Sequence, residues 1–149
     1  MKYKGGYRMF ERIIVALKFG PASLHALKKG MAIARLTNAD LHIFHALDYL
    51  MQDLDKNDAK LLKVKHETEH HYKSEVEPLL GDLKKVSFKC RPADPALEVC
   101  KMARDIKADL IVLGCHQRQE QMGMGRIDYV GMTILEKAPC SVILVPLFE

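Results

Sequence analysis

The most strand-like run of the chain is DLIVLG, at residues 109–114. Four consecutive aliphatic residues between Asp109 and Gly114 indicate a strand buried on both faces, which is typical of a parallel sheet covered by helices on each side. Further apolar runs follow the same alternation with helical segments. In all, strands are expected at residues 12–17, 41–46, 86–90, 109–114 and 142–145. The alternating pattern of the 86–90 run favours a strand at the sheet edge.

Helical patterns separate these runs, and two of them begin with clear capping signals. Pro21 follows Gly20, and Pro95 follows Asp94, so each proline occupies a first helical position where its missing N–H costs nothing. Gly30 lies inside the first helix, where close packing on a sheet would explain it. The helices are expected at residues 21–37, 58–80, 95–106 and 127–138.

Strands that alternate with helices predict an α/β fold with a Rossmann-like parallel sheet and helices on both faces. Pro146 is expected to close the last strand. Ligands of such sheets bind beyond the carboxyl ends of the strands. In this chain that rim consists of residues 17–18, 45–46 and 114–117.

The composition limits the classes of function. A length of 149 residues predicts a single domain over residues 1–149, with residues 1–9 expected to be an extension or a tag remnant. The net charge of +4, the absence of Trp and the 7% aromatic content argue against nucleic-acid binding. No apolar run approaches the roughly 18 residues of a membrane span, so we expect a cytoplasmic protein without a membrane partner. The four cysteines are widely spaced and are expected to be reduced.

The sharpest motif by spelling is His66-Glu67-x-x-His70. In this pattern two histidines one helical turn apart hold zinc, and the glutamate is the general base. A catalytic zinc needs a third protein ligand, yet after His71 the next histidine is His116. The surrounding segment is charged almost all round, as in a solvated helix face. We therefore expect no metal site and keep a zinc-dependent hydrolase as the least favoured alternative.

Three segments resemble the universal stress protein family. Residues 10–23 are similar to its opening strand and turn, and residues 41–48 to its second strand, with a histidine before a small residue. Residues 108–116 and 138–146 are similar to its last two strands. The resemblance therefore covers nearly the whole chain beyond Met9.

The resemblance implies a five-stranded parallel sheet in the order 3-2-1-4-5, of the adenine nucleotide alpha hydrolase kind. It also implies a homodimer in which the last strands of two chains pair antiparallel. An unprotected apolar edge strand invites such pairing. In this chain that strand consists of Val142, Ile143, Leu144 and Val145.

Family members that bind ATP or AMP resemble the pattern Gly-x-x-Gly, nine residues, then Gly-[Ser/Thr], together with an Asp at the end of the first strand. Here Gly114 matches the first glycine, but Gln117 replaces the second and Lys18 replaces the Asp. Asp128-Tyr129 aligns with the final Gly-[Ser/Thr] pair of the pattern, which puts a carboxylate where a phosphate would lie. Aligning Gly131-Met132 there instead needs a compensating deletion.

Other features favour an altered nucleotide or anion site. Ala46 matches the position whose backbone meets the adenine in the binding members, and Arg118 and Arg126 flank the loop, where they could reach phosphates. The candidate site comprises Ala16, Lys18, Ala46, Gly114, Gln117, Arg118 and Arg126.

The leading functional hypothesis is a homodimeric stress-response protein that acts through unidentified protein partners, without turnover and without a cofactor. The alternative is an ATP- or AMP-binding switch of the same fold, with slow ATP hydrolysis. The third hypothesis, from a different class, is a hydrolase built on His66 and His70.

Overall fold

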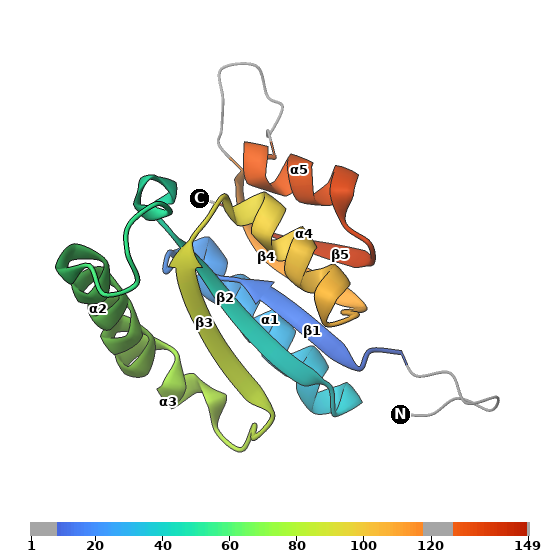
Figure 1. Ribbon diagram of the computed structural model, residues 1–149. Coiled ribbons are helices and arrows are strands. Elements are labelled where there is room, and N and C mark those ends of the chain that lie inside the picture. The colour runs from blue at the N-terminus through green and yellow to red at the C-terminus, as the bar shows by residue number, and fades with distance from the viewer. Residues whose placement is uncertain (1–8, 118–126, 149) are drawn as a thin grey trace.

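The computed structural model describes residues 9–117 and 127–148 (Figure 1). In chain order the elements are β1 (Arg12–Ala16), α1 (Pro21–Thr37), β2 (Asp40–Leu47), the short 3-10 helix η1 (Tyr49–Met51), α2 (Ala59–Glu75), α3 (Glu77–Leu80), β3 (Val86–Pro92), α4 (Pro95–Asp105), β4 (Leu110–Gln117), α5 (Tyr129–Lys137) and β5 (Ser141–Phe148).

The five strands form one sheet in the order β3-β2-β1-β4-β5, and every neighbouring pair is parallel. This confirms the predicted fold class and strand order, with β3 at one edge. The chain moves outward from β1 to β3 and then crosses back to β4, so the direction of winding reverses between β1 and β4. Ligand sites of open α/β sheets lie at such a reversal, beyond the carboxyl ends of the strands.

The core consists of two layers separated by the sheet. Ile13 and Val15 of β1 pack with α1 on one face, and Ile14 packs with α4 and α5 on the other. Figure 1 shows α1 behind the sheet and α4 in front of it. A methyl group at Gly30 would lie 2.7 Å from Val15 Cγ2, which confirms the close packing of this helix on the sheet.

Strand β5 runs on to Phe148, so the expectation that Pro146 closes it is wrong. Its register with β4 continues through Cys115, which lies opposite Pro146. An edge strand tolerates proline where the missing N–H would face away from the neighbouring strand. The backbone groups of successive residues alternate in direction, so Val142 and Leu144 share the outward direction of Pro146.

The long charged helix expected at residues 58–80 is divided at Val76 into α2 and α3. A proline in a helix interior lacks the N–H donor, and its ring collides with the carbonyl group four residues earlier. Helix α2 therefore ends at Glu75, and Pro78 occupies the first turn of α3, where no donor is needed.

Gly114 marks a close approach between the carboxyl end of β4 and the start of α1. A methyl group at this position would lie 2.4 Å from the carbonyl oxygen of Ala22 and 2.9 Å from the backbone nitrogen of Ser23. These are backbone atoms, which cannot swing aside as a long side chain can. Glycine is therefore required here by packing, and the close approach brings β4 to the region where β1 turns into α1.

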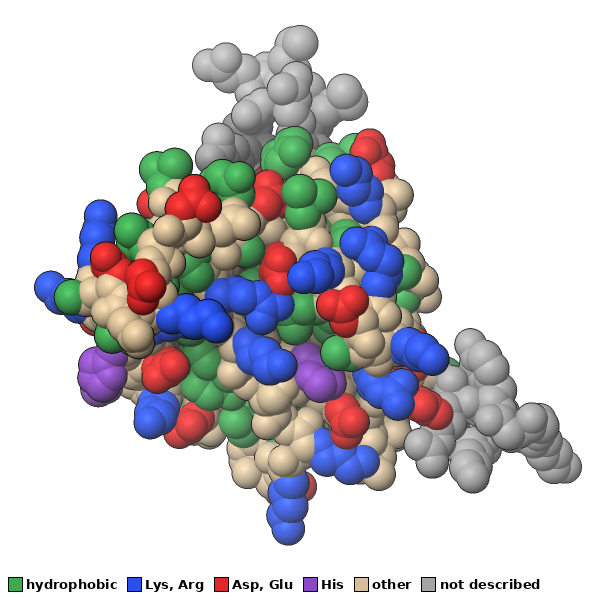
Figure 2. Space-filling model, in the orientation of Figure 1, with side chains coloured by type: hydrophobic (Ala, Val, Ile, Leu, Met, Phe, Trp, Pro, Cys, Tyr) green, Lys and Arg blue, Asp and Glu red, His purple; other side chains and the backbone are tan. Residues whose placement is uncertain are grey.

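Charges of both signs cover the surface. Figure 2 shows Lys and Arg side chains interleaved with Asp and Glu over the face that Figure 1 presents, as on an ordinary solvated surface. Within residues 9–117 and 127–148, none of the helices combines the length and the apolar character needed to span a membrane.

Replacing Gly114 by Ala should lower the free energy of unfolding by about 1–3 kcal/mol, because the added methyl group overpacks against the backbone of α1. The matched control is Gly20→Ser, since nothing lies within 4 Å of an added Cβ atom there and serine is a favoured helix cap. Urea unfolding of the three proteins measures the difference. An unchanged midpoint for Gly114→Ala would contradict the close approach of β4 and α1.

Candidate functional site

The turn between β1 and α1 is held by Ser23, a buried residue in the first turn of the helix. Its hydroxyl oxygen accepts a hydrogen bond from the backbone N–H of Lys18 (2.8 Å) and donates one to the carbonyl oxygen of Ala16 (3.4 Å). Phe19 has a φ of 58°, a left-handed conformation that is uncommon for an aromatic residue. Together these features fix the backbone of Lys18 just beyond the end of β1.

His45 ties strand β2 to the same turn. Its Nδ1 lies 2.7 Å from the carbonyl oxygen of Leu17, and because a carbonyl only accepts, Nδ1 carries the proton. The His45 ring makes an edge contact with Phe19 at 4.9 Å between centroids, and Phe19 also stacks on His71 of α2 at 4.3 Å. Burial lowers the pKa of His45 below 6.5; the bond to Leu17 opposes this change and repulsion from His71 adds to it.

A cavity of about 490 Å³ opens at the carboxyl ends of β1, β2 and β4. Small-molecule pockets typically span about 300–1,000 Å³. The apolar side chains that line it include Ala16, Phe44, Ala46, Val99, Leu113 and Val130. The polar and charged ones are Lys18, Ser23, His45, Asp48, Tyr49 and Asp128. Its position matches the winding reversal of the sheet, where a ligand is expected.

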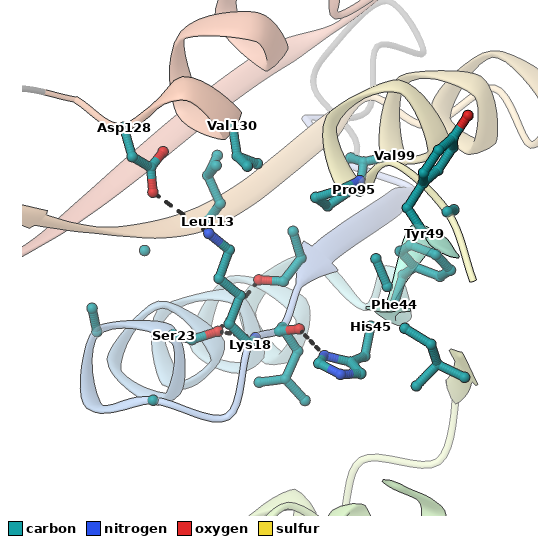
Figure 3. Close-up of a pocket in the computed structure, with 18 of the residues that line it drawn as sticks. Lys18, Ser23, Phe44, His45, Tyr49, Pro95, Val99, Leu113, Asp128 and Val130 are labelled. Atoms are coloured by element: carbon teal, nitrogen blue, oxygen red, sulfur yellow. Dashed lines mark hydrogen bonds and ion pairs between the residues drawn. The ribbon is translucent and has the colours of Figure 1, made fainter. Parts of the chain in front are cut away.

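Lys18 and Asp128 face each other at this cavity (Figure 3). The Nζ of Lys18 lies 3.6 Å from Oδ2 of Asp128, and the side chains are 56% and 46% exposed, so the pair contributes only about 0–1 kcal/mol. The other carboxylate oxygen accepts from the backbone N–H of Gly131 at 2.7 Å and caps helix α5. Because of this cap α5 begins at Tyr129, and Ile127, expected on its apolar face, precedes the helix.

The structure brings four of the seven predicted site residues to the cavity. They are Ala16, Lys18, Ala46 and Gly114. Gln117 is the last residue of β4, whereas Arg118 and Arg126 lie outside the described residues. Their roles in binding stay predictions. Lys18 already faces the carboxylate of Asp128. Gly114 is required to be glycine by its close approach to Ala22, whether or not a ligand binds.

The zinc-like motif lies on α2, where His66, Glu67 and His70 are all exposed. The helix is anchored instead by Tyr72, which is buried and stacks on Phe88 of β3 at 4.0 Å between ring centroids. In the described ranges, no group of three or more His, Cys, Asp or Glu side chains is arranged to hold a metal ion. The motif therefore has no additional ligand in that part of the chain.

Cys115, next to Gly114 in β4, is a buried free thiol. Burial raises its pKa, and the negative charge of Asp128 raises it further. The thiolate is the nucleophilic form of cysteine, and it is disfavoured at this position. Cys115 therefore acts as a packed side chain near the site.

Sequence reasoning missed several residues of the site. Ser23 carried a usable signal, because serine in a first helical turn often bonds to nearby backbone groups. His45 was placed at the rim but not among the binding residues. The contact between Phe19 and His71, and the position of Tyr49, carried no local signal because they depend on how distant segments pack.

The family model described as the universal stress protein family matches residues 9–146 of the chain. Among solved structures, the chain is similar to universal stress protein UspA from Lactobacillus plantarum, with 17% identity and a TM-score of 0.71 over 91% of this chain and 97% of that one. It is also similar to a universal stress protein in complex with cAMP, with 20% identity and a TM-score of 0.61 over 91% and 96% of the two chains. A third similar structure is the universal stress protein from Archaeoglobus fulgidus in complex with dAMP, with 16% identity and a TM-score of 0.62 over 92% and 98%. No curated protein sequence matches the chain. At these identities the structural likeness shows the fold.

The stability of the protein should fall as the pH drops below 6.5. Burial lowers the pKa of His45 and of His42 in the folded state, so below 6.5 the unfolded chain takes up protons that the folded chain does not. Protonation therefore favours unfolding, and the melting temperature should decrease from pH 7 to about pH 5.5.

The variant His45→Asn tests the contribution of this residue, since the amide can replace the Nδ1 donor without titrating. It should reduce the pH dependence of the melting temperature. The matched control, His70→Asn on the exposed side of α2, should leave it unchanged. Equal pH profiles for His45→Asn and the parent protein would contradict the assignment.

Proposed function

The chain belongs to the universal stress protein family, and from this premise we propose a cytoplasmic stress-response protein that acts through contact with partners and carries out no chemical turnover. The observation that carries the proposal is that three polar side chains of the cavity are bonded to the protein's own backbone. Ser23 and His45 hold the turn after β1, and Asp128 caps α5. A general acid or base must instead be free to exchange a proton with its substrate.

The second candidate function is a switch of the same fold that binds ATP or AMP. The cavity beyond β1, β2 and β4 favours it, and so does the similarity to universal stress proteins in complex with cAMP and dAMP. In this candidate Ala46 would meet the adenine, and Lys18, Arg118 and Arg126 would reach the phosphates. Any ATP hydrolysis would depend on that binding.

The proposed assembly is a homodimer joined through the outer edge of β5. This strand pairs only with β4 among the described strands. Val142 and Leu144 pack toward α5, whereas Ile143 and Val145 pack on the face of α1. Because the four side chains are used in the protein's own core, a second copy would pair with the backbone of the edge.

A thermal-shift titration separates the two candidate functions. For action through partners alone, ATP, ADP and AMP with magnesium should change the melting temperature by less than about 2 °C. A nucleotide switch would gain about 2.7 kcal/mol at one hundred times Kd, which raises the melting temperature by roughly 5–10 °C. Release of inorganic phosphate from ATP, measured on the same samples, would contradict the absence of turnover.

Sedimentation equilibrium tests the homodimer, for which twice the chain mass of 16.9 kDa is expected. Val142→Pro removes an N–H that faces outward, so it should yield monomers that remain folded. Ile143→Pro removes an N–H that faces β4, and should instead lower stability by about 1–3 kcal/mol, because a carbonyl group of β4 loses its donor. A monomeric parent protein, or a dimeric Val142→Pro variant, would count against pairing through β5.

A further inference from the structure

We propose that Asp128 makes the cavity selective for an uncharged ligand of nucleoside size over the phosphate esters of that ligand. The inference rests on one part of the second candidate function, that the cavity is a small-molecule site, and it changes the preferred ligand from a nucleotide to an uncharged nucleoside. The observations that support it come only from cavity residues that the structure describes.

The first step concerns the amino end of helix α5. The N–H groups and the dipole of a helix make this end a favourable place for an anion. Here Oδ1 of Asp128 accepts from the N–H of Gly131 at 2.7 Å, so the chain's own carboxylate occupies that place. A phosphate group approaching this end of the nine-residue helix would meet a negative charge that the cap holds in position.

The second step concerns the positive charge available to a phosphate. Lys18 is the sole Lys or Arg among the described residues that line the cavity, and its ammonium group faces Asp128 at 3.6 Å. The pair is half exposed, so Lys18 can turn toward a ligand at little cost. Asp128 is held more firmly, because moving it would also break the cap of α5, which contributes about 1 kcal/mol. A phosphate that attracts Lys18 would therefore still lie beside an unneutralised carboxylate.

The third step is the total charge of the lining. A second carboxylate, Asp48, lines the cavity and accepts from the backbone N–H of Leu50 at 2.9 Å. His45 donates to Leu17, and its lowered pKa keeps it neutral near pH 7. The described part of the lining thus carries one positive and two negative residues, a balance that disfavours an anion at this part of the cavity.

The remaining lining suits an uncharged ligand with an aromatic ring. Figure 3 places Phe44, Pro95 and Val99 on the side of the cavity away from Asp128, so the ring would lie there and the polar end near Lys18 and Asp128. Hydroxyl groups can donate to the carboxylate and accept from the ammonium group. An ionised phosphate can only accept, so it satisfies Lys18 but not Asp128.

Isothermal titration of the full chain with adenosine and with AMP tests the inference. The parent protein should bind adenosine at least about tenfold more tightly than AMP. Asp128→Asn keeps the helix cap, since asparagine is also a favoured capping residue, but removes the charge and releases Lys18. It should tighten AMP at least about tenfold and change adenosine by less than about threefold.

Asp48→Asn is the matched control. It also removes one carboxylate from the cavity lining, but it leaves the Lys18 pair and the cap of α5 intact. Its affinity for AMP should rise by less than that of Asp128→Asn, because Asp128 and its pair with Lys18 remain. If Asp128→Asn does not fold, the titrations are repeated on the parent protein at increasing salt concentration. Raising the ionic strength should reduce the preference for adenosine, because exposed charges are screened.

The outcomes separate the inference from the functions on which it rests. AMP binding that equals or exceeds adenosine binding in the parent protein overturns the inference and leaves the nucleotide switch in place. An unchanged ratio in Asp128→Asn overturns the role of Asp128. Binding of neither ligand at millimolar concentration overturns the inference together with the switch, and leaves action through partners.

Discussion

Strand β1 is buried on both faces, and this constraint sets the rest of the architecture. Ile13, Ile14 and Val15 lose all their exposed surface, and burying each such side chain contributes about 1.5–3 kcal/mol. Because successive side chains of a strand point to opposite faces, one strand needs a helical layer on each side. Its carboxyl end then emerges between the two layers. The cavity lies there, bounded by the starts of α1, α4 and α5.

The charges at the cavity follow from how each side chain is anchored. The backbone of Lys18 is fixed through Ser23, but its side chain is free to move from one partner to another. The carboxylate of Asp128 is held by the N–H of Gly131 and cannot move without uncapping α5. A cap of this kind contributes about 1 kcal/mol to helix stability. The negative charge of the site is therefore held more firmly than the positive charge.

Local sequence patterns were sufficient for the strands, because aliphatic runs such as residues 109–114 identify a buried strand without any knowledge of the fold. The strand order came from the family resemblance. Pro146 was misread because its effect depends on whether the strand lies at an edge, which is a property of the sheet. The division at Val76 could have been predicted, since Pro78 cannot occupy a helix interior.

The candidate site was harder to predict, because it depends on residues far apart in the chain. The carboxylate of Asp128 was expected near a phosphate position, but nothing local indicated that Lys18 would face it. Gly114 illustrates a second difficulty. Its glycine suggested a phosphate-binding loop, whereas the backbone of Ala22 lies too close for any side chain. A phosphate-binding loop and a close backbone contact both call for glycine, and only the packing around Gly114 shows which of the two applies.

The charged helix α2 gains a structural role from the same reasoning. Phe19 carries a left-handed backbone, which costs about 1–2 kcal/mol in a residue with a side chain. Its ring contacts His45 on one strand and His71 on α2, and aromatic pairs of this kind contribute about 0.5–1.5 kcal/mol each. The two contacts together are large enough to offset the strain. The turn that presents Lys18 is thus supported by β2 and by α2, so the helix that carries the zinc-like motif helps to determine the geometry of the cavity.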